Sequence, residues 1–353
     1  MNNFKKLGLT ALAGSLVAVS AQAGEMSVSG AANVSYVTGE TYTSGKSIGS
    51  DQDVAFSGSG ELDNGWTFTM ATTMTDANTV SSSYTSLTMG SMGTLKFGNA
   101  TGGASGKYDE EVPQAYEQTS DAQANSANLV GSSLDSNAIQ YNSASYDLEG
   151  GMSASFDIDY TPMASDAAAV DGGASTYSST WGEGMGVGVT VVSDTGLTFG
   201  IYGAERENKT PAEGLASTAG GGDEFTGASY VTYSNGPLSV GYSMTYYDGG
   251  LGTAGGAKTA AKTITTAEGI FESTSMSIAY TVNDNLSLSY TDTEDEYDGG
   301  SLDQVTQDTT AIQVAYSMGG MSIKAYRMET DNPGYDSDAD ALTVSEITLG
   351  LAF

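Results

Sequence analysis

Carboxylates are the side chains in this sequence with the most evident chemical potential. The chain has 43 Asp and Glu against 11 Lys and Arg, a formal net charge of −32, and it contains neither His nor Cys. Without imidazole or thiol groups, the usual general base, the commonest metal ligand and a nucleophilic sulfur are all missing. We therefore expect no enzyme. We also expect no nucleic-acid binding, because such an acidic surface repels the phosphate backbone.

The acidic residues gather in three polar stretches. The longest, 101–136, contains the basic residue Lys107 and the carboxylates Asp109, Glu110, Glu111, Glu117, Asp121 and Asp135. The other two contain Asp331, Asp336, Asp338 and Asp340, and Asp292, Glu294, Asp295, Glu296 and Asp298. Clustered loop carboxylates could bind calcium, which takes six to eight oxygen ligands. The spacing from Asp336 to Asp340 resembles the start of a calcium loop, although Ala341 stands at the glycine position. The alternative is a hydrated acidic rim.

The amino terminus indicates export from the cytoplasm. Lys5 and Lys6 precede an apolar stretch from Leu7 to about Ser20, which ends in the small-residue pattern Ala21-Gln22-Ala23. This order is typical of a cleaved secretory signal peptide, and ~14 apolar residues are too few to span a bilayer as a helix. We expect cleavage after Ala23, so that residues 1–23 form the signal peptide and 24–353 a single domain.

Alternation of apolar and small polar residues runs through the rest of the chain. In 26–36, Met26, Val28, Val34 and Tyr36 alternate with Ser and Asn, and no window of ~18 apolar residues follows the amino terminus. A period of two predicts strands with one apolar and one polar face. The same pattern recurs in segments around 54–62, 66–74, 185–191, 197–201, 238–244, 276–282, 286–290, 312–316 and 347–353.

Two kinds of link alternate between these segments. The short links carry turn residues and lie at 63–65, 90–93, 147–151, 193–196, 234–237, 283–285 and 319–320. The longer polar links lie near 38–52, 76–83, 101–136, 161–184, 205–224, 248–269, 295–308 and 330–340. Loops sorted by length in this way are typical of outer-membrane barrels. The order predicts an all-β fold, a transmembrane barrel of sixteen antiparallel strands.

The two faces of the strands predict a wet lumen. The off-phase residues are too small and polar to fill a core, so the apolar series should face lipid and Tyr84, among other tyrosines, should join the outer aromatic girdle. Lys96 lies between Leu95 and Phe97, and Lys324 between Ile323 and Ala325, so both lysines should point into the lumen. The apolar phase of the last strand changes near Val344, which indicates a bulge.

Two segments resemble the general bacterial porin family. The run 347–353 is similar to the family's last strand and ends in the aromatic Phe353, and 86–99 resembles the hairpin before its third loop, with Asn99 where a basic residue often stands. The resemblance implies that Phe353 is the signal read by the barrel-assembly machinery. It also implies a homotrimer in outer-membrane lipid that passes small hydrophilic solutes.

The resemblance further implies that the third loop, here 101–136, folds into the barrel and narrows it. Its carboxylates are then candidates for the constriction: Asp109, Glu110, Glu111, Glu117 and Asp121. Carboxylates in a pore favour cations over anions. The expectation is a passive diffusion channel with cation preference and no cofactor, apart from the calcium considered above.

Three other functions compete with this interpretation. A substrate-specific outer-membrane channel would share nearly every feature. A secreted calcium-binding surface-layer β protein would share the acidity, but it requires tandem glycine- and aspartate-rich nonapeptides, which the sequence lacks. A membrane-embedded esterase or protease barrel would require a His partner, and there is none.

Overall fold

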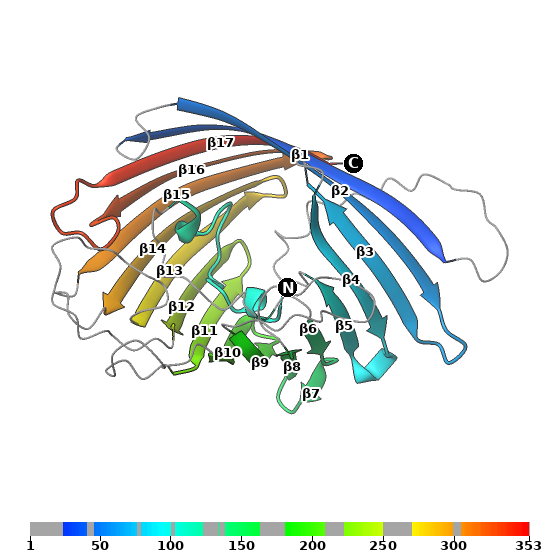
Figure 1. Cartoon of the computed structure of the whole chain (residues 1–353). Coiled ribbons are helices and arrows are strands. Elements are labelled where there is room, and N and C mark those ends of the chain that lie inside the picture. Colours follow the sequence, from blue (N-terminus) through cyan, green and yellow to red (C-terminus); the bar gives the residue numbers. More distant parts are fainter. Residues whose placement is uncertain are drawn as a thin grey trace.

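The strands form one antiparallel sheet that closes on itself (Figure 1). The computed structural model describes residues 24–40, 46–75, 79–99, 103–122, 134, 138–162, 181–208, 222–249, 270–298 and 305–352. Apart from β6 and β7, which both pair with β8, strands that are neighbours in the chain pair with each other. β1 pairs with both β2 and β17, so that the first and last strands join. The predicted closed barrel is confirmed.

The strands have the following bounds. The first part of the sheet comprises β1 Glu25–Glu40, β2 Lys46–Glu61, β3 Thr67–Met74, β4 Val80–Thr88, β5 Thr94–Asn99, β6 Ala138–Asn142, β7 Tyr146–Leu148 and β8 Met152–Thr161. The second part comprises β9 Trp181–Ser193, β10 Leu197–Asn208, β11 Glu224–Asn235, β12 Leu238–Asp248, β13 Ile270–Asn283, β14 Leu286–Asp298, β15 Thr306–Met318, β16 Met321–Asp331 and β17 Leu342–Ala352. The short 3-10 helices with described bounds are η2 Gly90–Met92, η3 Ser105–Lys107 and η4 Thr119–Ala122. None of the helices within the described residues has the length and apolar character needed to cross a membrane.

The sheet has seventeen strand segments but sixteen barrel positions. Both β6 and β7 pair with β8, and only residues 143–145 separate them, so together they form one interrupted strand. At the interruption the backbone N–H of Ser143 donates to Phe156 O at 2.9 Å, and the N–H of Phe156 donates to Ser143 Oγ at 2.8 Å. The serine side chain thus replaces a ladder bond where regular pairing stops. The predicted number of sixteen strands is confirmed.

The two faces of each strand differ as the alternation predicted. In β13, Met276 and Ile278 are exposed on the outer face, whereas Ser273, Ser275 and Ser277 on the inner face are buried. The ladder pairs Ile278 with Val240 on one side and with Tyr290 on the other, which continues the apolar surface across strands. A barrel with its large apolar residues outside and small polar residues inside suits a bilayer with a wet lumen.

The short links are tight turns stabilised by local conformation. Gly65 and Gly196 adopt φ of +79° and +93°, a region that costs glycine little, and Leu62 and Trp66 bond across the first turn at 2.7 Å. The 283–285 turn uses no glycine. Instead, the Asn283 side chain accepts hydrogen bonds from the N–H groups of Asn285 and Leu286 at 2.9 and 3.1 Å.

Two expectations about strand ends were wrong. Several of the longer links are shorter than predicted, because the ladders continue past the end of the apolar pattern: Asp292, Glu294, Asp295 and Glu296 lie within β14 rather than in a loop. The predicted bulge near Val344 is absent from the pairing of β17 with β1 and β16. Val344 pairs with Met328 on the inner face, where both pack in an apolar cluster with Tyr116. The phase change therefore reflects an apolar patch inside the barrel.

Candidate functional site

The segment 103–122, within the third long link, lies against the inner face of the barrel. Its hydrogen bonds reach inward-facing side chains of β8, β13, β14, β15 and β17. In Figure 1 the segment is drawn in cyan and teal inside the arch of strands. These bonds fasten it along one side of the wall, from the eighth strand to the last.

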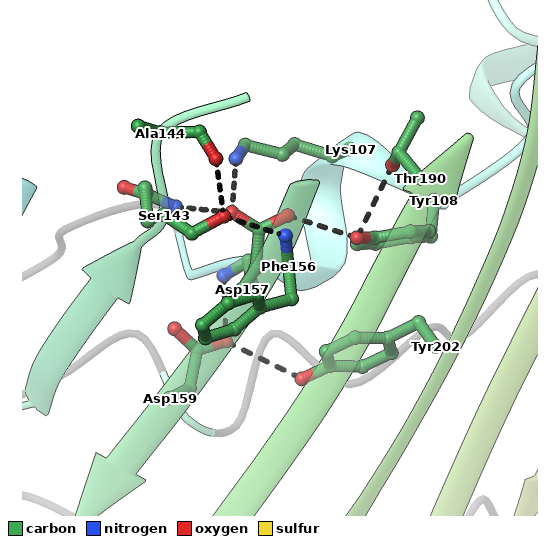
Figure 2. Close-up of polar contacts among 11 residues, drawn as sticks. Lys107, Tyr108, Ser143, Ala144, Phe156, Asp157, Asp159, Thr190 and Tyr202 are labelled. Carbon is green, nitrogen blue, oxygen red and sulfur yellow. Dashed lines mark hydrogen bonds and ion pairs between the residues drawn. The ribbon is translucent and has the colours of Figure 1, made fainter. Parts of the chain in front are cut away.

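The first anchor consists of Lys107 and Tyr108 of the segment, which bind to one of two aspartates on β8 (Figure 2). Asp157 accepts hydrogen bonds from the Lys107 ammonium and, at 2.8 Å, from the Tyr108 hydroxyl. Asp159 accepts one from the backbone N–H of Ala104 at 2.6 Å. Both aspartates are buried, so their charges are removed from water and need such partners. The Lys107 ion pair also neutralises the basic residue of the segment.

The ring of Tyr108 fills a space between inward-facing side chains. It is fully buried and stacks on Tyr202 at a centroid distance of 5.3 Å, with Tyr230 at 6.2 Å on a tilted plane. Thr190 donates a further hydrogen bond to its hydroxyl at 3.3 Å. Burial raises the pKa of Tyr108 above its ordinary value, so the hydroxyl remains a donor to Asp157 across the neutral range.

The middle of the segment is held by the polar inner face of β13 to β15. Ser277 Oγ donates to Pro113 O at 2.8 Å, and the N–H of Ala115 donates to Ser289 Oγ at 2.9 Å. Gln313 makes two bonds to consecutive residues: its Oε1 accepts from the N–H of Tyr116 at 2.8 Å, and its Nε2 donates to Glu117 O. Hydroxyl and amide side chains of the wall thus form hydrogen bonds with the backbone N–H and C=O groups of a segment that has no regular secondary structure.

The second anchor is Tyr116, which reaches the last strand. Its hydroxyl donates to Glu346 Oε1 at 2.7 Å and lies 2.9 Å from Thr348 Oγ1. Its ring packs beside Tyr326 at 5.8 Å, and the Lys324 ammonium lies 5.0 Å from its centroid. Burial raises the pKa of Tyr116 as well, so it stays neutral beside the Glu346 carboxylate.

The predicted acidic residues do not form one group. Glu110 is 3% exposed, has a positive φ of 39°, and accepts hydrogen bonds from Thr119 and Ser120 at 3.3 and 3.2 Å, which closes the segment on itself. Asp109, Glu111 and Glu117 are partly exposed. The backbone of Asp121 lies in η4, and its side chain and the whole of Asp135 lie outside the described residues.

The two predicted lumen lysines lie on the inner face, each beside a tyrosine ring. Lys96 pairs with Ser86 in the register, and its ammonium lies 4.2 Å from the centroid of Tyr84. Lys324 lies next to Tyr116, as described above. Tyr84 therefore faces the lumen, and its assignment to the outer aromatic girdle was wrong. Tyrosine alone does not mark the lipid face, because a lumen with cations accommodates it equally well.

Asp157 and Asp159 were not singled out from sequence. The signal was available in the run Phe156-Asp157-Ile158-Asp159-Tyr160, where acidic residues occupy the off-phase positions of a strand. A carboxylate between lipid-facing apolar residues must point inward, which makes it a partner for any segment inside the barrel.

The remaining candidates for a site lie near the strand ends. Asp331 ends β16, and Asp336 accepts a hydrogen bond from the N–H of Asp338 at 2.9 Å in the turn that leads to Asp340. Within the described part of the chain no three carboxylates approach closely enough to hold a metal ion. Calcium binding thus stays a prediction from the sequence. Phe353 and the signal peptide 1–23 lie outside the described residues.

Comparisons with known proteins agree with this architecture. The sequence matches the family described as Gram-negative porin over residues 8–261, whereas no curated protein sequence matches it. Similar solved structures include a porin, with 15% identity, a TM-score of 0.61 and coverage of 93% of this chain and 100% of that one. Salmonella typhi OmpF in complex with daunomycin has 12% identity, a TM-score of 0.65 and coverage of 94% and 98%. An anion-selective porin from Comamonas acidovorans has 14% identity, a TM-score of 0.62 and coverage of 94% and 100%.

Proposed function

This chain belongs to the Gram-negative porin family and is an outer-membrane channel, and from this premise we propose that it is a passive diffusion pore for small hydrophilic solutes with a preference for cations. The segment 103–122 is the part of the channel that narrows the lumen, and its partly exposed carboxylates set the charge of the narrow zone. No covalent chemistry is required for this function.

One observation carries the proposal: the segment crosses the inner wall from β8 to β17 and holds carboxylates without a free basic residue of its own. Asp109, Glu111 and Glu117 are partly exposed on it, while Lys107 is paired with Asp157. Carboxylates that line a narrow aqueous path lower the energy of a cation there and raise that of an anion. The nearby lysines, Lys96 and Lys324, reduce this effect but are outnumbered.

The test is single-channel recording in a planar bilayer under a salt gradient. We expect stable ohmic conductance and a reversal potential of cation-selective sign. The triple variant Asp109→Asn, Glu111→Gln, Glu117→Gln should shift the reversal potential toward zero. The control Asp63→Asn changes a carboxylate in one of the short turns, at the end of the barrel opposite the longer links, and should leave the reversal potential unchanged. Absence of conductance would reject the pore, and an anion-selective wild type would reject the acidic constriction.

A homotrimer is part of the proposal and rests on the outer face of β2 to β4. Gln52 shares this face with Val54 and Phe56, and Thr72 and Thr85 pair there with Phe56 and Met70. Amide and hydroxyl groups are costly against lipid chains, but a protein partner can satisfy them. Chemical cross-linking of the purified protein in mild detergent should give a trimer ladder, and a monomer at all concentrations would contradict this.

Export is the last part of the proposal. Signal cleavage after Ala23 and recognition of Phe353 by the assembly machinery are supported by the residue types at the two ends of the sequence. Amino-terminal sequencing of the protein from outer membranes should begin at Gly24. A Phe353→Ala variant should accumulate unfolded in the periplasm, and normal membrane levels of this variant would contradict the assembly role.

A further inference from the structure

Two glycines on the inner wall lie directly beneath the segment 103–122. Gly188 on β9 pairs with Asp157 on one side and with Tyr202 on the other, so all three face the lumen in one row. A Cβ atom at this position would lie 2.4 Å from the Tyr108 ring. The ring of the first anchor therefore occupies the volume that any other residue at 188 would need.

The second glycine, Gly241 on β12, has the same relation to the turn of the segment. It pairs with Thr232 and with the inward-facing Ser277. A Cβ atom there would lie 2.4 Å from Pro113 Cδ and 3.2 Å from the Cα of Val112. In this case the obstructing atoms belong to a proline ring and to the backbone, so no rotamer change can make room.

The atoms above both glycines are held in place by other contacts. Tyr108 is bonded to Asp157 and stacked on Tyr202, and Pro113 is bonded to Ser277 through its carbonyl oxygen. Ordinary carbon contacts lie at roughly 3.5–4.0 Å. A methyl group at either glycine would thus have to lift the segment by about 1 Å away from the wall, toward the lumen.

We propose that Gly188 and Gly241 are positioning residues that set how far the segment 103–122 projects into the lumen. The two glycines form sockets: one receives the ring of Tyr108, and the other receives Pro113. The absence of a side chain at both sites lets the segment lie close to the wall. The effect on conductance rests on the proposed function, whereas the position of the segment can be measured independently.

The chain contains no cysteine, which allows spin labels to be placed at chosen sites. One label replaces Gln114 on the segment, and the other replaces Ala55, an inward-facing residue of β2. Electron–electron dipolar spectroscopy then reports the distance across the lumen in the folded barrel. We expect Gly188→Ala and Gly241→Ala each to shorten this distance by ~1 Å and the double variant to shorten it further. Single-channel conductance should fall by up to about twofold, because it follows the open cross-section.

The matched control is Gly203→Ala on the adjacent strand β10. A Cβ atom there would meet only Phe225, at 3.7 Å, an ordinary contact on the outer face. This variant should change neither the distance nor the conductance. The rescue variant Gly241→Ala with Pro113→Ala removes the obstructing ring atom and should recover most of the lost conductance. Folding of every variant is checked by heat-modifiable migration on gels.

The outcomes separate this inference from the function on which it rests. Unchanged distances in folded Gly188→Ala and Gly241→Ala variants would overturn the inference. A shortened distance with unchanged conductance would support the sockets and would reject the segment as the constriction. Loss of conductance that Pro113→Ala does not restore, with an unchanged distance, would also overturn the inference, because the effect would then arise elsewhere in the wall.

Discussion

Two parts of the barrel wall differ in where their polar groups lie. For brevity, β8 to β15, which the segment 103–122 covers, are called the covered or apolar half, and β2 to β5 the other half. From β8 to β15, the inner face carries glycine, serine and glutamine buried beneath the segment 103–122, and the outer face is apolar, as at Val187, Ile201 and Ile278. From β2 to β5, the inner face carries Lys96 and Tyr84, while the outer face includes Gln52 and Thr85. The polar residues inside the covered half thus lie beneath the segment, whereas those outside the other half are the ones that we propose a neighbouring copy covers. Alternation alone does not reveal this difference, because both halves have the same period.

The largest expected effect comes from removing the first anchor of the covered half. Tyr108→Ala leaves a cavity between Tyr202, Tyr230 and Gly188, and large-to-small changes of buried aromatic residues typically cost about 3–5 kcal/mol. We expect this loss in the free energy of unfolding, measured by urea titration in lipid vesicles. Single-channel recordings should also show larger fluctuations of the current. Tyr108→Phe keeps the ring and should lose only the hydrogen bonds of the hydroxyl with Asp157 and Thr190. Equal effects of the two variants would show that packing is not what holds this anchor.

A charge on the outer face should distinguish the two halves directly. Ile278→Arg places a guanidinium among Val240 and Tyr290 in the apolar half, which should cost roughly 2–4 kcal/mol near the bilayer midplane. Gln52→Arg, on the other half, should change the stability of the monomer much less and should instead weaken the proposed trimer. Urea titration and cross-linking measure the two quantities. Similar costs at both positions would mean that lipid contacts both halves alike.

Loss of the second anchor should have a smaller effect on the free energy of unfolding. Tyr116→Phe removes the hydroxyl that donates to Glu346, and hydrogen bonds to charged groups contribute about 1.5–3 kcal/mol. The ring beside Tyr326 and Lys324 is kept, so the segment should keep its average position. We expect frequent brief changes of current in single-channel traces. Glu346→Gln, which retains an acceptor, should show fewer of them, and a quiet Tyr116→Phe channel would contradict the anchor.

The smallest effect concerns individual carboxylates. Glu117→Gln removes a partly exposed charge and should lower the cation-to-anion permeability ratio by about twofold. Glu110→Gln removes a charge that is turned into the segment and bonded to Thr119 and Ser120, so the ratio should hardly change. Reversal potentials in a salt gradient measure both. A larger shift for Glu110→Gln would mean that this carboxylate, rather than Glu117, faces the ions.

Local patterns sufficed for the barrel itself. Turn residues such as Gly65 and Asn283, together with the period of two, predicted the strand number. The turn predicted at 147–151 is formed as well, with positive φ at Gly150 and Gly151. The strand ends were missed because backbone pairing continues past the apolar band of the outer face, where the side chains are no longer apolar. The loop 38–52, for example, was predicted to include Asp51, which instead pairs with Asn33 inside the ladder.

The candidate site could be predicted only in part, because its contacts join residues far apart in the chain. The acidic segment and the inward direction of Lys96 and Lys324 follow from composition and alternation. That Glu110 turns away, that Tyr116 meets Glu346, and that Gly188 receives a ring all depend on how an irregular segment packs on the wall. Such packing produces no periodic pattern in the sequence. The off-phase aspartates 157 and 159 were the one readable sign of where the segment is attached.

The pairing of β1 with β17 also bears on the timescale of folding. Ala31 lies opposite Ala352, so the closing seam joins residues from opposite ends of the chain. Contacts of such long sequence separation form slowly, because the entropy of closing the ring must be paid before the seam can form. The same topology should make the finished barrel slow to come apart, since β1 and β17 pair with each other and leave no free edge at the two ends of the sheet. The lifetime of the channel should therefore be governed by its unfolding rate rather than by its equilibrium stability.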